Sequence, residues 1–137
     1  MRDVQLFIDG RWSDASGGRW EEVENPATGE TVARVAMASA DDLERAAKAA
    51  SRGFAVWKAI PAVKRADIMH NAAALLRERA EAIAPNLTEE QGKPLANSIN
   101  EARNAAAVID WFAEEGRRVH GRTIQPRGAP CAPPRRC

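Results

Sequence analysis

The chain has 137 residues and a formal net charge of +1, a length that leaves room for one domain. Setting aside the three arginines of the last thirteen residues leaves 17 of the 20 basic side chains against 19 acidic ones, about −2. This near-balance disfavours nucleic acid or an anionic membrane as the main partner. No apolar run approaches the roughly 20 residues that span a bilayer, and the N-terminus lacks a secretory signal. Because both cysteines lie near the C-terminus, no disulfide framework is predicted, and we expect a cytoplasmic protein.

Short strands joined by tight turns are predicted for the first thirty-five residues. Asp9-Gly10 separates two β-prone runs and favours a two-residue hairpin turn, because glycine tolerates a positive φ. Residues 30–35 alternate and are rich in β-branched side chains, as expected for a half-buried strand. The predicted strands are 5–8, 11–12, 20–24 and 30–35, and the remaining turns are 16–18 and 25–29.

Residues 39–120 carry helical periodicity. Ser39 and Asp42 predict a capping box at the start of the first helix. Pro61 begins the second helix, Pro85 disturbs the segment that ends at Gly92, and Pro94 begins the longest helix. The predicted apolar faces are Leu43, Ala46, Ala47, Ala50, Phe54 and Trp57; then Ile68, Ala72, Leu75, Leu76 and Ile83; and then Leu95, Ile99, Ala102, Ala106, Ile109 and Ala113.

Chemical motifs are sparse, and we predict no catalytic, cofactor-binding or metal-binding residue. His70 and His120 are fifty residues apart and are interpreted as surface or helix-end histidines. Adjacent acids such as Asp41-Asp42 point about 100° apart on a helix, so they favour solvated faces over a paired-carboxylate site. Trp111 and Phe112 are interpreted as core rings, with a role in lining a substrate site as the alternative.

Four segments carry a family resemblance: LFIDGRW at 6–12, NPATGE at 25–30, EQGKPL at 90–95 and IDWFAEEGRRVHGRTI at 109–124. With them, residues 4–124 resemble the N-terminal quarter of an NAD(P)-dependent aldehyde dehydrogenase, most closely the succinate-semialdehyde dehydrogenase branch. The resemblance implies an α/β fold with a doubly wound cofactor domain, a catalytic domain and an oligomerisation arm in a homo-oligomeric enzyme. This chain would supply only the N-terminal portion, short β-hairpins followed by an α-helical segment.

The resemblance also implies a chemistry that this chain lacks. In the family, a cysteine adds to the aldehyde, hydride passes to the nicotinamide of NAD or NADP, and a glutamate-activated water releases the acid. Those residues lie downstream in the family, and neither Cys131 nor Cys137 has the surroundings of the nucleophile. Trp111 and Phe112 would approach the family's aldehyde tunnel. We therefore expect the chain alone to bind no cofactor and to be inactive.

The last thirteen residues, QPRGAPCAPPRRC, have no apolar periodicity and predict a disordered tail. We divide the chain into 1–124, the N-terminal part of an aldehyde dehydrogenase domain, and 125–137, the tail. Residues from about Arg127 onward are hypothesised to be read out of frame, with a genuine Pro/Arg-rich tail as the alternative. Two other roles stay open: a small helical module that binds a full-length homologue, and a non-functional gene remnant. Uncovered apolar stripes predict aggregation or loose packing of the chain alone.

Overall fold

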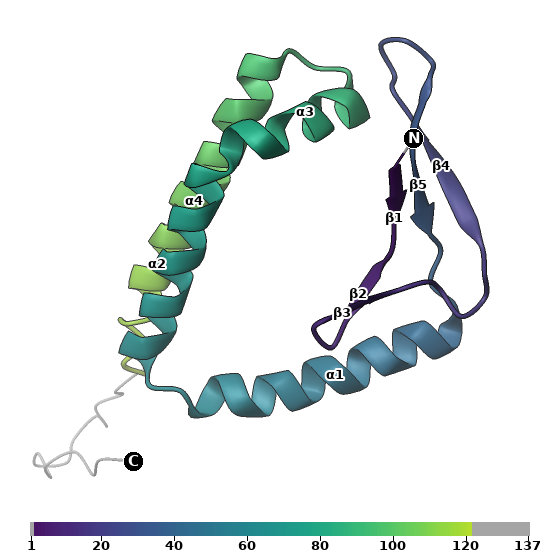
Figure 1. Cartoon of the computed structure of the whole chain (residues 1–137). Coiled ribbons are helices and arrows are strands. Elements are labelled where there is room, and N and C mark those ends of the chain that lie inside the picture. Colours follow the sequence, from purple (N-terminus) through teal and green to yellow (C-terminus); the bar gives the residue numbers. More distant parts are fainter. Residues whose placement is uncertain (1, 122–137) are drawn as a thin grey trace, which may run out of the picture.

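The computed structural model describes residues 2–121, so the predicted tail at 125–137 and the end of the predicted 1–124 segment lie outside the described residues. Strands come first and helices follow, which confirms the predicted order (Figure 1). The elements are β1 (Arg2–Val4), β2 (Leu6–Ile8), β3 (Arg11–Ser13), β4 (Trp20–Glu24), β5 (Thr31–Ala36), α1 (Ala40–Ala59), α2 (Ala62–Glu78), α3 (Ala80–Gln91) and α4 (Leu95–Glu115).

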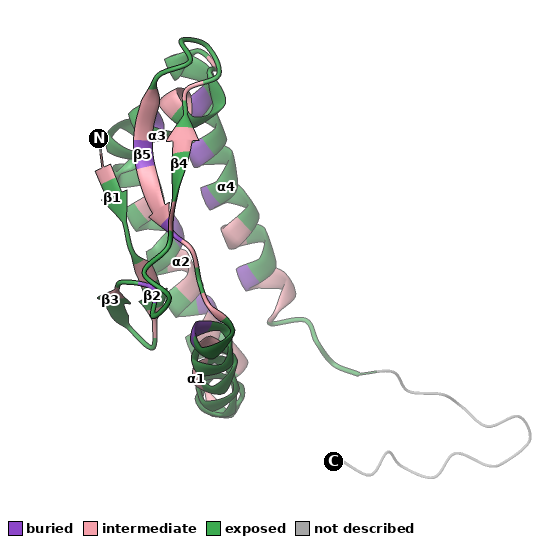
Figure 2. Cartoon of the chain, turned by 90° about the vertical axis from the view of Figure 1, so that its right-hand side faces the viewer, coloured by how far each residue is buried: buried purple, intermediate pink, exposed green. Residues whose placement is uncertain are grey.

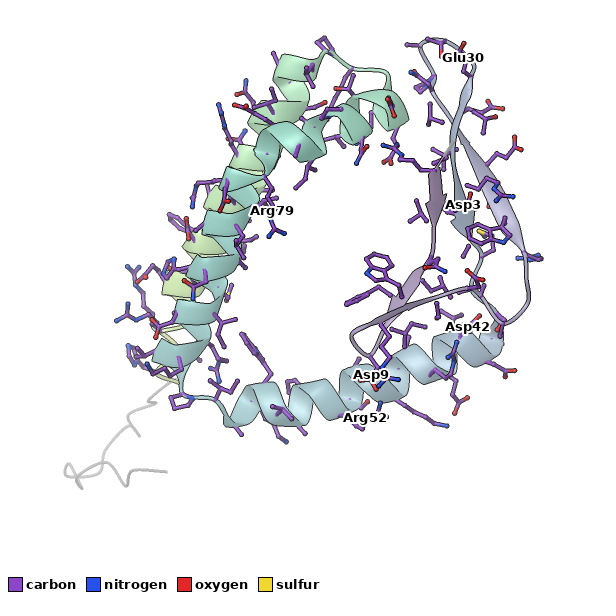
Figure 3. All side chains as sticks on the ribbon, in the orientation of Figure 1. Asp3, Asp9, Glu30, Asp42, Arg52 and Arg79 are labelled. Atoms are coloured by element: carbon purple, nitrogen blue, oxygen red, sulfur yellow. The ribbon has the colours of Figure 1, made fainter. Side chains whose placement is uncertain are left out.

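The predicted hairpin is confirmed in β2 and β3, which pair antiparallel with Phe7 opposite Trp12. Asp9 and Gly10 both have positive φ, 55° and 77°, as a tight turn matched to the strand twist requires. The Phe7 and Trp12 rings contact each other with centroids 4.9 Å apart. Arg52 of α1 donates to Asp9 at 2.9 Å, so the hairpin turn rests beside α1 (Figure 3).

The second sheet has the order β1-β5-β4 and contains one strand that was not predicted. β5 pairs antiparallel with β4, as expected, and parallel with β1. Arg34 on the central strand links both neighbours: its guanidinium donates to Asp3 at 3.0 and 2.6 Å and lies 5.2 Å from the ring centroid of Trp20. β1 is only three residues long, too short to give a detectable alternation.

A buried carboxylate joins the strands to the helices. Ser39 and Asp42 form the predicted capping box, and Asp42 also accepts from the Ser16 amide at 3.0 Å and pairs with Arg45. The prediction of a solvated Asp42 is wrong, since its side chain is fully buried. Buried carboxylates need such donors, and here the Ser39 amide and Arg45 hold the pKa of Asp42 far below its usual range. This contribution to stability is present above the ordinary pKa and is lost only in strong acid.

Helices α2, α3 and α4 form one packed unit in which α4 contacts both of the others. The predicted second helix does not run through to Ile83: the backbone bends at Arg79, and Pro85 lies inside α3. The bend lets α2 and α3 each lie against α4 (Figure 1). Ser98, fully buried on α4, shares a 2.8 Å hydrogen bond with Thr88 of α3.

The buried apolar residues of the described part are all alanines, so the predicted apolar faces are only partly buried. Most of α1 is exposed, whereas the buried positions of α4 follow one side (Figure 2). Leu43 and Phe54 of α1 are each 63% exposed. The buried apolar residues are Ala15, Ala33, Ala36, Ala66, Ala73, Ala80, Ala84, Ala102, Ala106 and Ala113. None of the helices within residues 2–121 has the length and hydrophobicity to cross a membrane.

Removing the hydroxyl of Ser39 tests the strand–helix junction. Ser39→Ala deletes the cap of the Asp42 amide and the 2.7 Å bond to Ser16, so we expect the first turn of α1 to lose about 1 kcal/mol. Amide hydrogen exchange of that turn, followed by NMR, then accelerates. Ser51→Ala is the matched control, because Ser51 lies inside the same helix and its hydroxyl makes no hydrogen bond among the described contacts. Equal exchange in the two variants contradicts the assigned role of the cap.

Candidate functional site

Trp111 and Phe112, the candidate substrate-lining residues, lie on the outer surface of α4. Trp111 is 67% exposed and Phe112 59%, so the interpretation of both as core rings is wrong for the described residues. Trp111 lines a surface hollow of about 420 Å³ together with His70, Asp110 and Glu114. Phe112 is not among the residues of that hollow, so the two rings do not share one site here. Their role beside an aldehyde stays a prediction.

His70 connects α2 to α4 through both ring nitrogens. Nδ1 lies 2.7 Å from Oδ1 of Asp110, and Nε2 lies 2.9 Å from Oε1 of Glu114. The second oxygen of Asp110 pairs with Arg77 of α2, and Arg117 lies 3.5 Å from Glu114. His70 therefore bridges the two helices from the middle of α2, and its side chain is still 38% exposed. Of its two interpretations, the one as a surface histidine agrees with the structure, and the one as a helix-end histidine is wrong.

The charges in this cluster stabilise one another. Hydrogen bonds that the ring donates to Asp110 and, second, to Glu114 raise the pKa of His70 above its ordinary value. The same bond from His70, followed by that from Arg77, lowers the pKa of Asp110, and His70 lowers the pKa of Glu114. The arrangement binds a proton on the imidazole while both acids stay ionised.

The described residues bring together no metal site: within 2–121, no three His, Cys, Asp or Glu side chains could hold an ion. The two ring nitrogens of His70 point in different directions, each toward a different carboxylate. A metal ion bound to one nitrogen therefore cannot also be bound by both Asp110 and Glu114. Both cysteines lie at 131 and 137, outside the described residues.

Two sequence motifs that are 65 residues apart meet at the end of α3. Gly92 of EQGKPL caps α3 with φ 64°, in the left-handed region. A Cβ placed there would lie 2.9 Å from Cγ of Pro26 and 3.1 Å from the amide nitrogen of Ala27, both in NPATGE. Only glycine satisfies this backbone conformation and this close approach together. The glycine therefore fixes how α3 lies against the 25–29 turn.

The sequence pattern of the aldehyde dehydrogenase family matches residues 12–133. The chain belongs to the aldehyde dehydrogenase family. It is 46% identical to 3-sulfolactaldehyde dehydrogenase of Pseudomonas putida and 42% identical to the NADP(+) succinate-semialdehyde dehydrogenase of Escherichia coli. Each alignment spans 120 residues, 88% of this chain and 25% of the relative. The crystal structure of succinate-semialdehyde dehydrogenase from Burkholderia pseudomallei is 40% identical, has a TM-score of 0.84, and is matched over 90% of this chain and 26% of its own.

The comparisons confirm the predicted family and the α/β aldehyde dehydrogenase-like fold. This chain spans about a quarter of the length of the relatives it matches. The matched range of the aldehyde dehydrogenase pattern continues past residue 124, so the boundary between 1–124 and 125–137 stays a prediction.

The His70 cluster was missed because its partners are forty or more residues apart in the sequence. Asp110 and Glu114 have the i, i+4 spacing that places two carboxylates on one helix face. That spacing is a signal for a cation opposite them, but it does not identify the helix that supplies it.

Gly92→Ala tests the contact between the two aldehyde dehydrogenase motifs. The new Cβ displaces the 25–29 turn, so we expect the Thr28 and Gly29 amides, which bond to the Asn25 carbonyl at 3.2 and 2.8 Å, to exchange faster. An acceleration of about tenfold or more corresponds to a local cost of about 1.4 kcal/mol. Gly18→Ala is the control, since Gly18 has φ 63° with nothing within 4 Å of a Cβ. If both variants leave Thr28 and Gly29 unchanged, the close approach at Gly92 does not hold the turn.

Proposed function

We propose that this chain supplies the N-terminal packing segment of an enzyme that oxidises aldehydes to carboxylic acids with NAD or NADP, and that it catalyses no oxidation alone. The observation that carries the proposal is the distribution of apolar side chains. Alanines are the fully buried apolar residues among the described elements, while many of the large apolar side chains are left exposed. Such faces are expected on a segment whose covering surface lies in the other three-quarters of the relatives.

The exposed large apolar side chains lie on both the strands and the helices of the described structure. No neighbouring element within residues 2–121 covers them. They include Phe7 and Trp12 of the hairpin, Leu43, Phe54, Val56 and Trp57 of α1, Val63, Ile68 and Leu75 of α2, and Leu95, Val108, Trp111 and Phe112 of α4. So much exposed apolar surface is unusual for a protein that acts as a monomer in water. It supports a segment that is completed by further polypeptide.

The connection from a strand to a helix within residues 2–121 supports the expectation that the chain alone binds no dinucleotide. The connection from β5 to α1 is Met37-Ala38-Ser39, without the glycines that let a pyrophosphate approach the backbone. The N-terminus of α1 is already capped by Ser39, and Asp41 and Asp42 put negative charge in its first turn. An anionic phosphate is disfavoured there by repulsion from the two carboxylates.

The substrates to test are small anionic aldehydes. The two relatives above are named for 3-sulfolactaldehyde and succinate semialdehyde, which carry a sulfonate and a carboxylate. We infer that the complete enzyme acts on an aldehyde of this class, with NADP as the first cofactor to test because the E. coli relative is named for it. A homo-oligomeric assembly and a cytoplasmic location, both expected from the sequence, remain predictions.

The second candidate is a helical module that binds a full-length homologue. It is favoured by one observation, the uncovered stripe of α1 that contains Leu43, Phe54 and Trp57. It differs from the first proposal in a measurable way. A module binds an intact homologue with fixed stoichiometry, whereas a packing segment binds only where the homologue's own N-terminal quarter is missing.

A chimera tests the proposed function. Residues 4–121 replace the matching quarter of the E. coli succinate-semialdehyde dehydrogenase, and NADPH formation from succinate semialdehyde is measured. We expect the chimera to be active and the isolated chain to form no NADPH or NADH. Activity of the isolated chain contradicts the proposal, as does an inactive chimera that is folded and oligomeric like its parent. Stoichiometric binding of the isolated chain to the intact E. coli enzyme favours the module instead.

A further inference from the structure

We propose that His70 is a proton-operated clamp between α2 and α4: as an imidazolium it donates to Asp110 and Glu114 at once, and loss of one proton loosens the helix pair. The inference is independent of the proposed function, because it concerns only contacts among residues 2–121.

The geometry specifies the charged form of the ring. A neutral imidazole carries one N–H and one bare nitrogen, whereas the imidazolium carries two N–H donors. Both ring nitrogens of His70 face a carboxylate oxygen, at 2.7 Å from Asp110 and 2.9 Å from Glu114. With both carboxyl groups ionised, as their lowered pKa values favour, a bare nitrogen at either distance would place two lone pairs opposite each other, and only the imidazolium satisfies both contacts.

The clamp sits in the most extensive contact between helices in the described chain, that of α2 with α4. Asp110 and Glu114 are one turn apart on α4, so both contacts bear on the same end of that helix. The buried residues close to these positions in the sequence are Ala73 of α2 and Ala106 and Ala113 of α4. Alanine side chains bury little apolar area, so they contribute little hydrophobic free energy to the contact between the helices. Polar bridges therefore have a large share in holding this end of the pair together.

The charged groups around the clamp set what happens when His70 loses its proton. On α2, Arg77 pairs with Asp110. Just after the end of α4, Arg117 lies 3.5 Å from Glu114, and Arg118 borders the same hollow as Glu115 of α4. α3, which also packs on α2, directs no charged group at His70 among the described contacts. Each carboxylate thus still has an arginine partner when His70 is neutral. Deprotonation of His70 therefore loosens the contact between α2 and α4 without leaving Asp110 or Glu114 unpaired.

The sign of the pH dependence follows from the direction of each shift. The pKa of His70 is raised above 6.5, so its contribution is fully present below that value and is lost as the pH rises through the raised pKa. The pKa values of Asp110 and Glu114 are lowered from 3.8 and 4.5, so their contributions are lost only as the pH falls through the lowered values. The clamp is strongest between these limits, in mildly acidic solution.

NMR titration of the His70 ring in the full-length chain tests the proposal, with His120→Gln used to assign the two histidine signals. We expect His70 to titrate at higher pH than in the same chain unfolded in urea. Asp110→Asn combined with Glu114→Gln should move the titration down towards the unfolded value. A His70 signal that titrates as in the unfolded chain overturns the proposal, whatever the state of the other elements.

The consequence for the helices is measured by hydrogen exchange in α2 and α4 from about pH 5 upward, after correction for the intrinsic pH dependence of exchange. In the unmodified chain, protection falls as His70 loses its proton. His70→Arg keeps a cation at all these pH values and should abolish that fall, while His70→Gln should show low protection throughout. If the arginine variant loses protection over the same pH range as the unmodified chain, another group is responsible and the clamp is excluded.

Discussion

The helices of this chain approach one another through alanine and serine, and this close contact decides where the larger side chains go. α4 contacts both α2 and α3. The buried apolar residues there include Ala66 and Ala73 on α2, Ala80 at the start of α3, and Ala102 and Ala106 on α4. Small residues let two helix backbones come close, but each buries little apolar area and contributes little hydrophobic free energy. Large apolar residues cannot enter such a contact without overpacking it, so they lie beside it half-buried or on exposed faces of the helices.

Polar anchors supply what the small apolar core lacks. Asp42 and Ser98 are the largest side chains that are fully buried in the described part, and each joins two elements. Asp42 ties the loop at Ser16 to α1, and Ser98 ties α4 to Thr88 of α3. Buried polar groups with all their partners specify one arrangement, whereas a loss of one partner is costly. The arrangement of the layers therefore depends on a few hydrogen bonds between elements in addition to hydrophobic burial.

The sequence was informative where structure is local. The turn at Asp9-Gly10, the capping box at Ser39 and the glycine cap at Gly92 each follow from the conformational preferences of a few neighbouring residues, and all three are present. The resemblance of NPATGE and EQGKPL gave the family and the fold, which no single element could have given. The motifs gave no indication that they touch each other.

The errors concern contacts between distant elements. Periodicity placed large side chains such as Leu43 and Phe54 on an apolar face, and such a pattern cannot tell whether the covering surface lies within the same chain. For the same reason, the burial of Asp42 and the bridge at His70 escaped prediction, since each depends on a partner 26 or more residues away. β1 was missed because its pairing with β5 is parallel and non-local.

The central claim is that the exposed apolar faces are interior surface of a complete aldehyde dehydrogenase, and thiol labelling tests it most directly. In the isolated chain, Cys131 and Cys137 are first replaced by serine. Phe54→Cys is then introduced into that chain and into the chimera, which contains residues 4–121 and so lacks both native cysteines. Glu44→Cys, on the polar side of α1, is the matched control. The account predicts that Cys at position 54 reacts rapidly in the isolated chain and is protected in the chimera, above the background of the parent's own thiols, while the control reacts in both. Equal and rapid labelling of position 54 in the active chimera would contradict it.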